Sequence, residues 1–234
     1  MSEPSSLYRR HRFPPAIISY TVYLYYRFAV SYREVEEMLA RRGIVVSYET
    51  IRRWCLKFGP RFAAEIQRRR PYPRDHWHLD EMHLRIDGQT WYLWRAVDAD
   101  GMVLDVFLQR RRNQAAAEAL LQRLLDGQPT KPRVIITDKL ASYVPAIKKV
   151  FPHAEHRAHK GLNNRADNSH QPTRQRERAR RRFKMPAHTQ RFLESFGPIR
   201  QHFCPGRHLL PAAEYRAMME VRRAKWDELS GVAA

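Results

Sequence analysis

The sequence predicts an α/β protein in which a mixed β-sheet flanked by helices follows an N-terminal helical unit and precedes further C-terminal helices. Three apolar runs between Trp77 and Leu108 are separated by Asp87-Gly88 and by Asp100-Gly101. Asp-Gly between apolar runs is typical of tight hairpin turns, so these runs predict an antiparallel meander. Helical and strand-like segments then alternate over residues 113–157, which favours additional strands in the same sheet.

The composition favours a polyanionic partner. The 234 residues carry 43 Lys and Arg against 24 Asp and Glu, a net charge of +19. Nucleic acid is the usual partner for such an excess, and a basic but otherwise ordinary enzyme is the alternative. Two distant cysteines, Cys55 and Cys204, argue against a disulfide framework and suit a reducing cytosol. We expect no membrane partner, because no run reaches the ~18 apolar residues of a membrane span and the N-terminus lacks a signal-peptide pattern.

The N-terminal part predicts three helices. Pro14 and Pro15 open the first, the capping box Ser31-Tyr32-Arg33-Glu34 begins the second, and the third runs from Tyr48 to Phe58. A short helix, a glycine turn at Gly43 and a helix with a basic outer face are typical of a helix-turn-helix. The alternative is a plain three-helix bundle with a solvated face, and the net charge favours DNA contact. The candidate DNA-binding residues of the third helix are Thr50, Arg52, Arg53 and Lys57.

The domain boundaries follow from composition. Arg68 to Pro73 is basic and contains two prolines, which favours an extended linker. We expect a flexible basic arm at 1–13, the helix-turn-helix domain at 14–60, the linker at 61–73, the sheet domain at 74–184 and a C-terminal helical segment at 185–234.

Two aspartates lie on predicted strands or at their ends. Because side chains alternate along a strand, Asp80 shares a face with the apolar Met82 and Leu84. An acid on such a face is costly unless it has a partner, and a metal ion is one such partner. Asp138 follows the apolar run 134–137, which is typical of a central strand. The simpler alternatives are an arginine partner for Asp80 and a helix-cap role for Asp138.

The predicted order of strands and helices matches the ribonuclease H-like fold. In that fold the first and fourth strands are neighbours, so the resemblance implies that Asp80 lies next to Asp138. Further on, residues 165–184 hold eight Lys and Arg against two acids, a plausible phosphate-binding face or an ordinary solvated helix. From this run we take Arg165, Arg174 and Arg178 as candidate DNA-binding residues.

Six motifs together resemble the IS-six family of bacterial insertion-sequence transposases, the cointegrate-forming type with an Asp-Asp-Glu active site. The similarity extends from about residue 12 to about residue 210. The motifs are Tyr32-Arg33-Glu34-Val35-Glu36-Glu37, His78-Leu79-Asp80-Glu81, Trp94-Arg95-Ala96-Val97-Asp98, Thr137-Asp138-Lys139, Asn163-Asn164-Arg165-Ala166 and Arg207-His208-Leu209-Leu210.

The resemblance implies a transposase that binds double-stranded DNA. Its helix-turn-helix would bind the terminal inverted repeats, and its ribonuclease H-like domain would nick DNA and join the freed 3′ hydroxyl to target DNA. Asp80, Asp138 and Asp167 would be the catalytic residues and would hold two Mg²⁺ ions, with Mn²⁺ as a substitute. Lys139 would contact phosphate or solvent. The resemblance also implies a homodimer or larger synaptic assembly in the bacterial cytoplasm, associated with the nucleoid.

The third acid departs from the family pattern. The family has glutamate where this chain has Asp167, whose side chain is one methylene shorter. Two other hypotheses therefore stay open. One is a catalytically impaired DNA-binding remnant or end-binding repressor. The other is a ribonuclease H-type nuclease for RNA–DNA hybrids, which gives no reason for a helix-turn-helix. For Asp98, which ends the motif Trp94-Arg95-Ala96-Val97-Asp98, we expect a structural role.

Overall fold

The computed structural model describes residues 6–179, 183–204 and 210–232. The chain forms two compact units. The first, here called the helical unit, comprises residues 1–70 and 195–234, and the second, the sheet unit, comprises residues 71–194. Three sequence predictions fall outside the described residues, namely the start of the basic arm at 1–5, the basic residues 180–182 and most of the motif at 207–210.

The helical unit contains the three helices predicted for the N-terminal part of the chain. Its elements are η1 (Ser6–Tyr8), α1 (Pro15–Arg27), α2 (Tyr32–Ala40), α3 (Tyr48–Arg69), α8 (Ala212–Leu229) and the end of α7 (Pro186–His202). The predicted capping box is present at the start of α2, where the Ser31 hydroxyl accepts from the Glu34 amide at 3.2 Å. Gly43, in the turn before α3, has a positive φ of 73°, a conformation that glycine adopts at little cost.

The predicted flexible arm is wrong for residues 6–13. Tyr8 stacks on Phe58 with 5.1 Å between ring centroids, and its hydroxyl donates to the Ser230 carbonyl at 2.6 Å. Phe13 packs edge-on against Trp54 at 5.2 Å. Although four of these eight residues are Arg or His, the burial of aromatic surface orders the segment.

The predicted end of the third helix at Phe58 is also wrong. Helix α3 continues through Pro60 to Arg69 and includes most of the expected linker. Phe62 is buried, and its ring lies 5.1 Å from that of Trp226 in α8. Pro60 removes one helical hydrogen bond, but the burial of Phe62 and the residues around it outweighs that loss.

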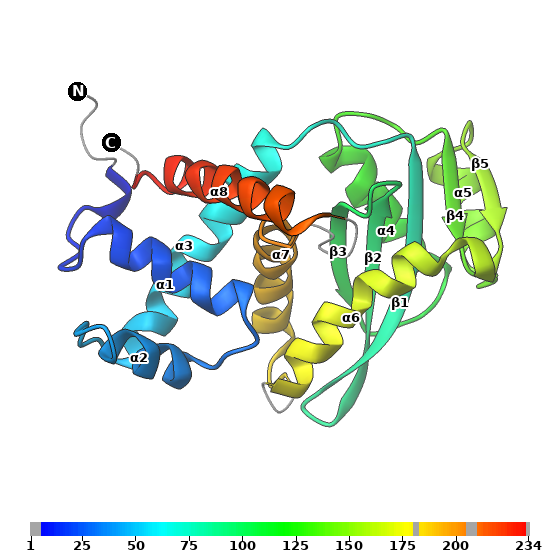
Figure 1. The fold of residues 1–234 in the computed structure, drawn as a ribbon. Helices are drawn as coiled ribbons and strands as arrows, with labels where there is room; N and C mark the ends of the chain where they lie inside the picture. Colours follow the sequence, from blue (N-terminus) through cyan, green and yellow to red (C-terminus); the bar gives the residue numbers. More distant parts are fainter. Residues whose placement is uncertain (1–5, 180–182, 205–209, 233–234) are drawn as a thin grey trace. The chain divides into compact units, whose positions relative to one another are not determined.

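The sheet unit has five strands in the order β3-β2-β1-β4-β5. The strands are β1 (His76–Ile86), β2 (Gln89–Asp98), β3 (Val103–Gln109), β4 (Val134–Thr137) and β5 (Glu155–Ala158). The first three form the predicted antiparallel meander, and β4 and β5 add in parallel (Figure 1). Asp87 and Gly88 both have positive φ, 50° and 73°, as the predicted tight turn requires. The mixed sheet and the ribonuclease H-like strand order are thus confirmed.

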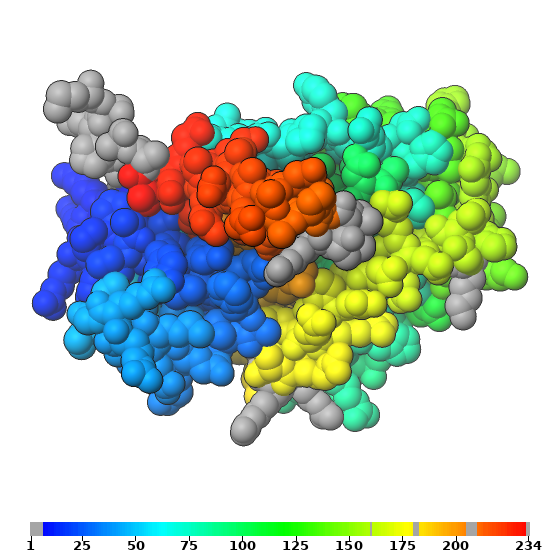
Figure 2. Space-filling view, in the orientation of Figure 1, coloured from blue at the N-terminus to red at the C-terminus, as the bar shows by residue number. Residues whose placement is uncertain are grey.

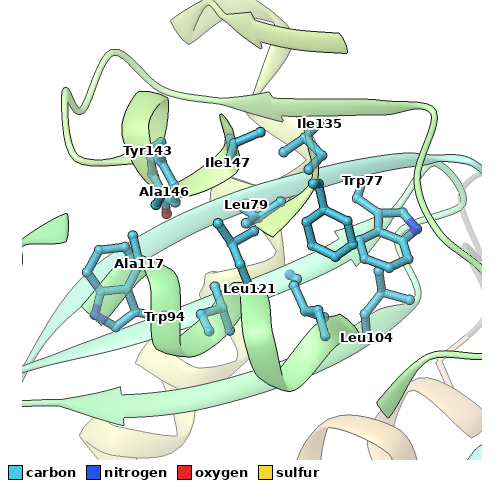
Figure 3. Packing of buried hydrophobic residues seen from close by; sticks show 14 of the residues in the cluster. Trp77, Leu79, Trp94, Leu104, Ala117, Leu121, Ile135, Tyr143, Ala146 and Ile147 are labelled. Atoms are coloured by element: carbon cyan, nitrogen blue, oxygen red, sulfur yellow. The ribbon is translucent and has the colours of Figure 1, made fainter. Parts of the chain in front are cut away.

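Helices cover both faces of this sheet (Figure 1). Helices α4 (Gln114–Gly127) and α5 (Tyr143–Val150) enclose the apolar core on one face together with Trp77, Leu79 and Trp94 (Figure 3). Helix α6 (Asn164–Ala179) lies against β1 and β2 on the other face and follows the short helix η2 (Lys160–Leu162). Strand β4 is buried throughout, as its continuous apolar sequence predicts. Across the described residues, each helix is too short or too polar to cross a membrane.

The packing of α3 beyond Pro60 gives a stability prediction. Phe62→Ala should destabilise the protein by about 3–5 kcal/mol, because it removes a buried aromatic ring and leaves a cavity beside Trp226. Arg61→Ala, at the exposed neighbouring position, is the control and should cost less than about 0.5 kcal/mol. Urea unfolding followed by tryptophan fluorescence measures both. Equal effects of the two substitutions would contradict a packed helix in this region.

Candidate active site

Two neighbouring parallel strands place Asp80 and Asp138 at the same level of the sheet. Strand β1 pairs with β4 through His78 and Ile136. Asp80 and Asp138 each lie two residues beyond that pair, at the carboxyl end of β4. The adjacency implied by the ribonuclease H-like strand order is therefore present.

Asp80 faces the side of the sheet that α6 covers. Its side chain is 14% exposed, and one carboxylate oxygen, Oδ2, lies 3.4 Å from Nε2 of the fully buried His170 in α6. Met82 and Leu84, which share its face, are buried as expected. A carboxylate in this position has lost most of its water but lies beside a helix that carries polar groups.

Asp138 begins the loop between β4 and α5. Its Oδ1 accepts a hydrogen bond from the Leu140 amide at 2.9 Å, which fixes the carboxylate relative to the loop. Its Oδ2 lies 3.7 Å from Nη2 of Arg112. The neighbouring Lys139 is exposed. Asp138 therefore has one oxygen held by the backbone and a second that faces a cation.

Asp167 lies exposed in the first turn of α6. Two buried residues attach this helix to the sheet. Asn163 donates through Nδ2 to the Leu79 carbonyl at 2.8 Å, one residue before Asp80. Arg95, which pairs with Asp80 across β1 and β2, donates to the Ser169 carbonyl and, at 2.7 Å, to the Thr173 hydroxyl. These contacts attach the start of α6 to the sheet beside Asp80.

The charges of Asp138 and Asp167 act on the pKa of Asp80. Burial, together with the negative charges of Asp138 and Asp167, raises the pKa of Asp80 to about 7. A hydrogen bond from the backbone at Glu81 and the charge of Arg112 act against this rise. Carboxylate oxygens suit a hard divalent cation such as Mg²⁺, and Asp80 and Asp138 lie on neighbouring strands.

Among the described residues, the three aspartates do not form a complete metal site. Within residues 6–179, 183–204 and 210–232, no three His, Cys, Asp or Glu side chains lie close enough together to hold a metal ion. The exposed side chain of Asp167 is one methylene shorter than the glutamate that the family has at this position. A side chain one methylene longer at this position would extend further from the first turn of α6.

A polar network that we did not predict from the sequence lies on the opposite face of β1. Glu81 is 1% exposed and faces α4 and α5, where it accepts from the Tyr143 hydroxyl at 2.9 Å and from Nε of Arg112 at 2.7 Å. Burial raises the pKa of Glu81 to about 7, against the effect of these two donors. Only the place of Glu81 on the same strand face as Trp77 and Leu79 could have indicated the network, because its partners are 31 and 62 residues away.

Asp98 has the structural role expected for it. The residue is fully buried, and its Oδ1 accepts from the amides of Asp100 and Met102 in the β2–β3 turn. Its Oδ2 accepts from the Arg74 amide at 3.2 Å. The carboxylate is thus occupied by backbone donors.

Comparison with known proteins identifies the family. Residues 74–204 match the family model described as a DDE domain. The transposase for insertion sequence element IS257 in transposon Tn4003 of Staphylococcus aureus is 33% identical over 168 residues, which cover 70% of this chain and 75% of that protein. The chain belongs to the IS-six family of DDE transposases. A second relative of this family member, the transposase for insertion sequence-like element IS431mec of Staphylococcus aureus strain Mu50, is 32% identical over the same shares.

Two solved structures are similar to this DDE transposase family member. The catalytic domain of Mos1 mariner transposase matches with a TM-score of 0.43 and 12% identity, over 74% of this chain and 93% of that chain. The HTLV-2 integrase catalytic core domain in complex with magnesium matches with a TM-score of 0.40 and 20% identity, over 53% and 85%.

Seven of the eight predicted DNA-binding residues of this family member lie on α3 or α6, and the eighth, Lys139, lies in the loop between β4 and α5. In α3, Arg53 is exposed and Arg52 is paired with Glu49 at 2.7 Å. Lys57 is exposed, with Nζ 2.7 Å from a ring nitrogen of His11, and the Thr50 hydroxyl lies 3.1 Å from that of Ser47. Helix α6 lies at the surface, in yellow in Figure 2. Its exposed basic residues include Arg165, Arg174 and Arg178.

The raised pKa of Asp80 gives a pH prediction for stability. Between pH 4 and pH 7 the folded state holds a proton that the unfolded state has lost, so this contribution to stability is complete below pH 4 and is lost as the pH rises to about 7. Asp80→Asn should therefore be more stable than the metal-free wild type at pH 8, by at most about 4 kcal/mol, and equal to it at pH 4.

Urea unfolding in EDTA at both pH values measures the difference. Asp126→Asn, which removes an exposed carboxylate on α4, is the control and should show no such pH dependence. A pH-independent difference for Asp80→Asn would contradict the electrostatic description of the site.

Proposed function

We propose that the chain is a transposase that binds the terminal inverted repeats of an insertion sequence and catalyses metal-dependent nicking and strand transfer of DNA, in the replicative, cointegrate-forming manner. The proposal is supported by the adjacency of Asp80 and Asp138 on neighbouring strands of a chain of this family. The activity of the relatives as transposases supports the same assignment.

The three carboxylates have distinct roles in this proposal. Asp80 would contribute its carboxylate from β1, Asp138 would contribute the oxygen that does not accept from the Leu140 amide, and Asp167 would contribute its carboxylate from the first turn of α6. They would hold two Mg²⁺ ions, or Mn²⁺ as a substitute. Such ions, when bound, neutralise charge on the attacked phosphate and make a water or 3′ hydroxyl nucleophilic near neutral pH.

Double-stranded DNA is the proposed partner of both units. In the helical unit, the second helix of the helix-turn-helix would lie in the major groove with Thr50, Arg52, Arg53 and Lys57 toward the inverted repeat. In the sheet unit, Lys139, Arg165, Arg174 and Arg178 would neutralise phosphates near the acids. Joining two ends of one element to target DNA favours a homodimer or a larger synaptic assembly, acting in the bacterial cytoplasm at the nucleoid.

A second candidate function is end binding without catalysis. Two features favour it: no three acidic or histidine side chains of the described residues lie close enough to hold a metal, and Asp167 is shorter than the family's glutamate. A catalytic group displaced by about 1 Å loses on the order of 100-fold in rate. Such a remnant would bind the inverted repeats as a repressor. The ribonuclease H-type nuclease is favoured by no specific feature, because it leaves the helical unit without a role.

Strand transfer of an inverted-repeat oligonucleotide in Mg²⁺ or Mn²⁺ tests the proposal. Asp80→Asn and Asp138→Asn should each reduce joining by at least about 100-fold, because each removes a charged ligand. Asp167→Glu should increase joining, since it restores the longer side chain of the family. Asp126→Asn is the matched control and should join as the wild type does.

The outcomes separate the candidates. Joining by the wild type that Asp80→Asn abolishes supports the transposase. No joining by the wild type, under conditions where Asp167→Glu joins, assigns this chain to the non-catalytic class. Faster cleavage of an RNA–DNA hybrid than of duplex ends would instead favour the nuclease.

DNA binding by α3 gives a separate prediction. Arg53→Gln should weaken binding to the inverted repeat and reduce the slope of log affinity against log salt by about 1, because one phosphate contact is lost. Arg61→Gln, further along the same helix, should leave the slope unchanged. Fluorescence anisotropy over a KCl series measures both. Identical slopes for Arg53→Gln and the wild type would exclude Arg53 from the phosphate contacts.

A further inference from the structure

The carboxylate of Asp138 is connected to the interior of the sheet unit by an arginine. Nη2 of Arg112 lies 2.6 Å from Oε1 of Glu81 and 3.7 Å from Oδ2 of Asp138. The same guanidinium group donates to Glu81 through Nε at 2.7 Å. One planar cation therefore lies between a buried carboxylate and a candidate metal ligand.

The buried end of this connection is rigid. Glu81 is held in β1, and its other oxygen, Oε2, accepts from the Tyr143 hydroxyl at 2.9 Å. Tyr143 is fully buried at the start of α5, and its ring packs edge-on against Trp94 at 5.6 Å. A carboxylate with both oxygens occupied and 1% exposure has little freedom to move.

The backbone of Arg112 is also fixed. The next residue, Asn113, is the N-cap of α4, and its side chain accepts from the Ala116 amide at 3.1 Å. Ala116 and the buried face of α4 belong to the same core cluster as Trp94 and Tyr143. The guanidinium group is therefore placed from both ends, by its own backbone and by Glu81.

We infer that Arg112 is a positioning residue that orients Asp138 for divalent metal binding, anchored by Glu81 and Tyr143. The inference rests on the proposed function, because it gives Asp138 the role of a metal ligand. The Leu140 amide fixes one oxygen of Asp138, and Arg112 lies on the side of the other. Together they set the direction in which Asp138 presents its charge.

The expected sign of the effect follows from the charges. Glu81 contacts Nε and Nη2 of Arg112 and so offsets part of the positive charge that Arg112 would present to an incoming cation. Loss of Arg112 removes the group that orients Asp138, and partners of metal ligands typically contribute 10–100-fold to metal affinity. Loss of Glu81 alone leaves an uncompensated cation beside Asp138, which competes with the metal. Both changes should therefore weaken metal binding.

Mn²⁺ titration of the full-length protein, followed by electron paramagnetic resonance of the free ion, tests the inference. Arg112→Gln should raise the Kd for Mn²⁺ by about 10–100-fold, whereas Arg111→Gln, which removes the adjacent exposed arginine, should change it less than about twofold. Glu81→Gln should also raise the Kd. In the Arg112→Gln background, Glu81→Gln should add almost nothing, because the route from Glu81 to Asp138 is already lost.

Two further measurements keep the result interpretable. Asp138→Asn retains an oxygen for the Leu140 amide but loses the charge, so it defines binding that depends on this site. Thermal unfolding identifies any variant that has lost its fold, and Arg112→Lys provides a second variant. Because lysine keeps the charge but lacks the guanidinium fork, its Kd should lie between those of the wild type and Arg112→Gln.

The outcomes separate this inference from the function on which it rests. If the wild type binds Mn²⁺ in a manner that Asp138→Asn abolishes, the metal site of the proposed function stands. If Arg112→Gln is then folded and has the Kd of the wild type, the positioning role of Arg112 is overturned alone. If the wild type and Asp138→Asn bind equally, the metal site and the positioning role are both overturned.

Discussion

The burial of the Asp80 carboxylate near other negative charges is the constraint on which the candidate site of the sheet unit depends. Parallel pairing of β1 with β4 places Asp80 and Asp138 side by side, and α6 adds Asp167. Burial and like charge both oppose ionisation of Asp80. The packing around Asp80 must outweigh the free energy that is needed to bury its carboxylate near other negative charges. A bound cation would lower that free energy.

The surrounding contacts hold each acid from a different direction. The meander and the core beneath it fix Asp80, the loop after β4 fixes Asp138 through the Leu140 amide, and α6 is attached through Arg95 and Asn163. The fully buried His170 also lies beside Asp80, and burial with the nearby charge of Arg95 keeps its pKa well below the usual range. It is therefore neutral near pH 7 and adds no charge to the site.

Much of the fold could be predicted because its signals are local. The Asp87-Gly88 turn, the capping box at Ser31 and the apolar run of β4 each determine their own backbone conformation. The predictions were wrong where contacts between residues far apart in the sequence determine the structure. Pro60 indicates a helix end. The helix continues because Phe62 packs against Trp226, which is far away in the sequence. The basic segment at 6–13 is ordered by aromatic contacts for the same reason.

The candidate site shows the same division. Asp80 and Asp138 could be found from strand patterns, and Asp167 from the family resemblance. Their electrostatic environment could not, because Arg112, Tyr143 and His170 reach it through tertiary contacts. The contribution of Asp167 also depends on side-chain reach, which a sequence match does not measure.

The central claim is that Asp80 and Asp138 are brought together to bind a divalent cation. A crystal structure of the protein with Mn²⁺, with anomalous scattering used to locate the metal, tests it most directly. The account predicts an anomalous peak about 2.1 Å from a carboxylate oxygen of both residues. A fully occupied Mn²⁺ site elsewhere, with no peak between these two carboxylates, would contradict it.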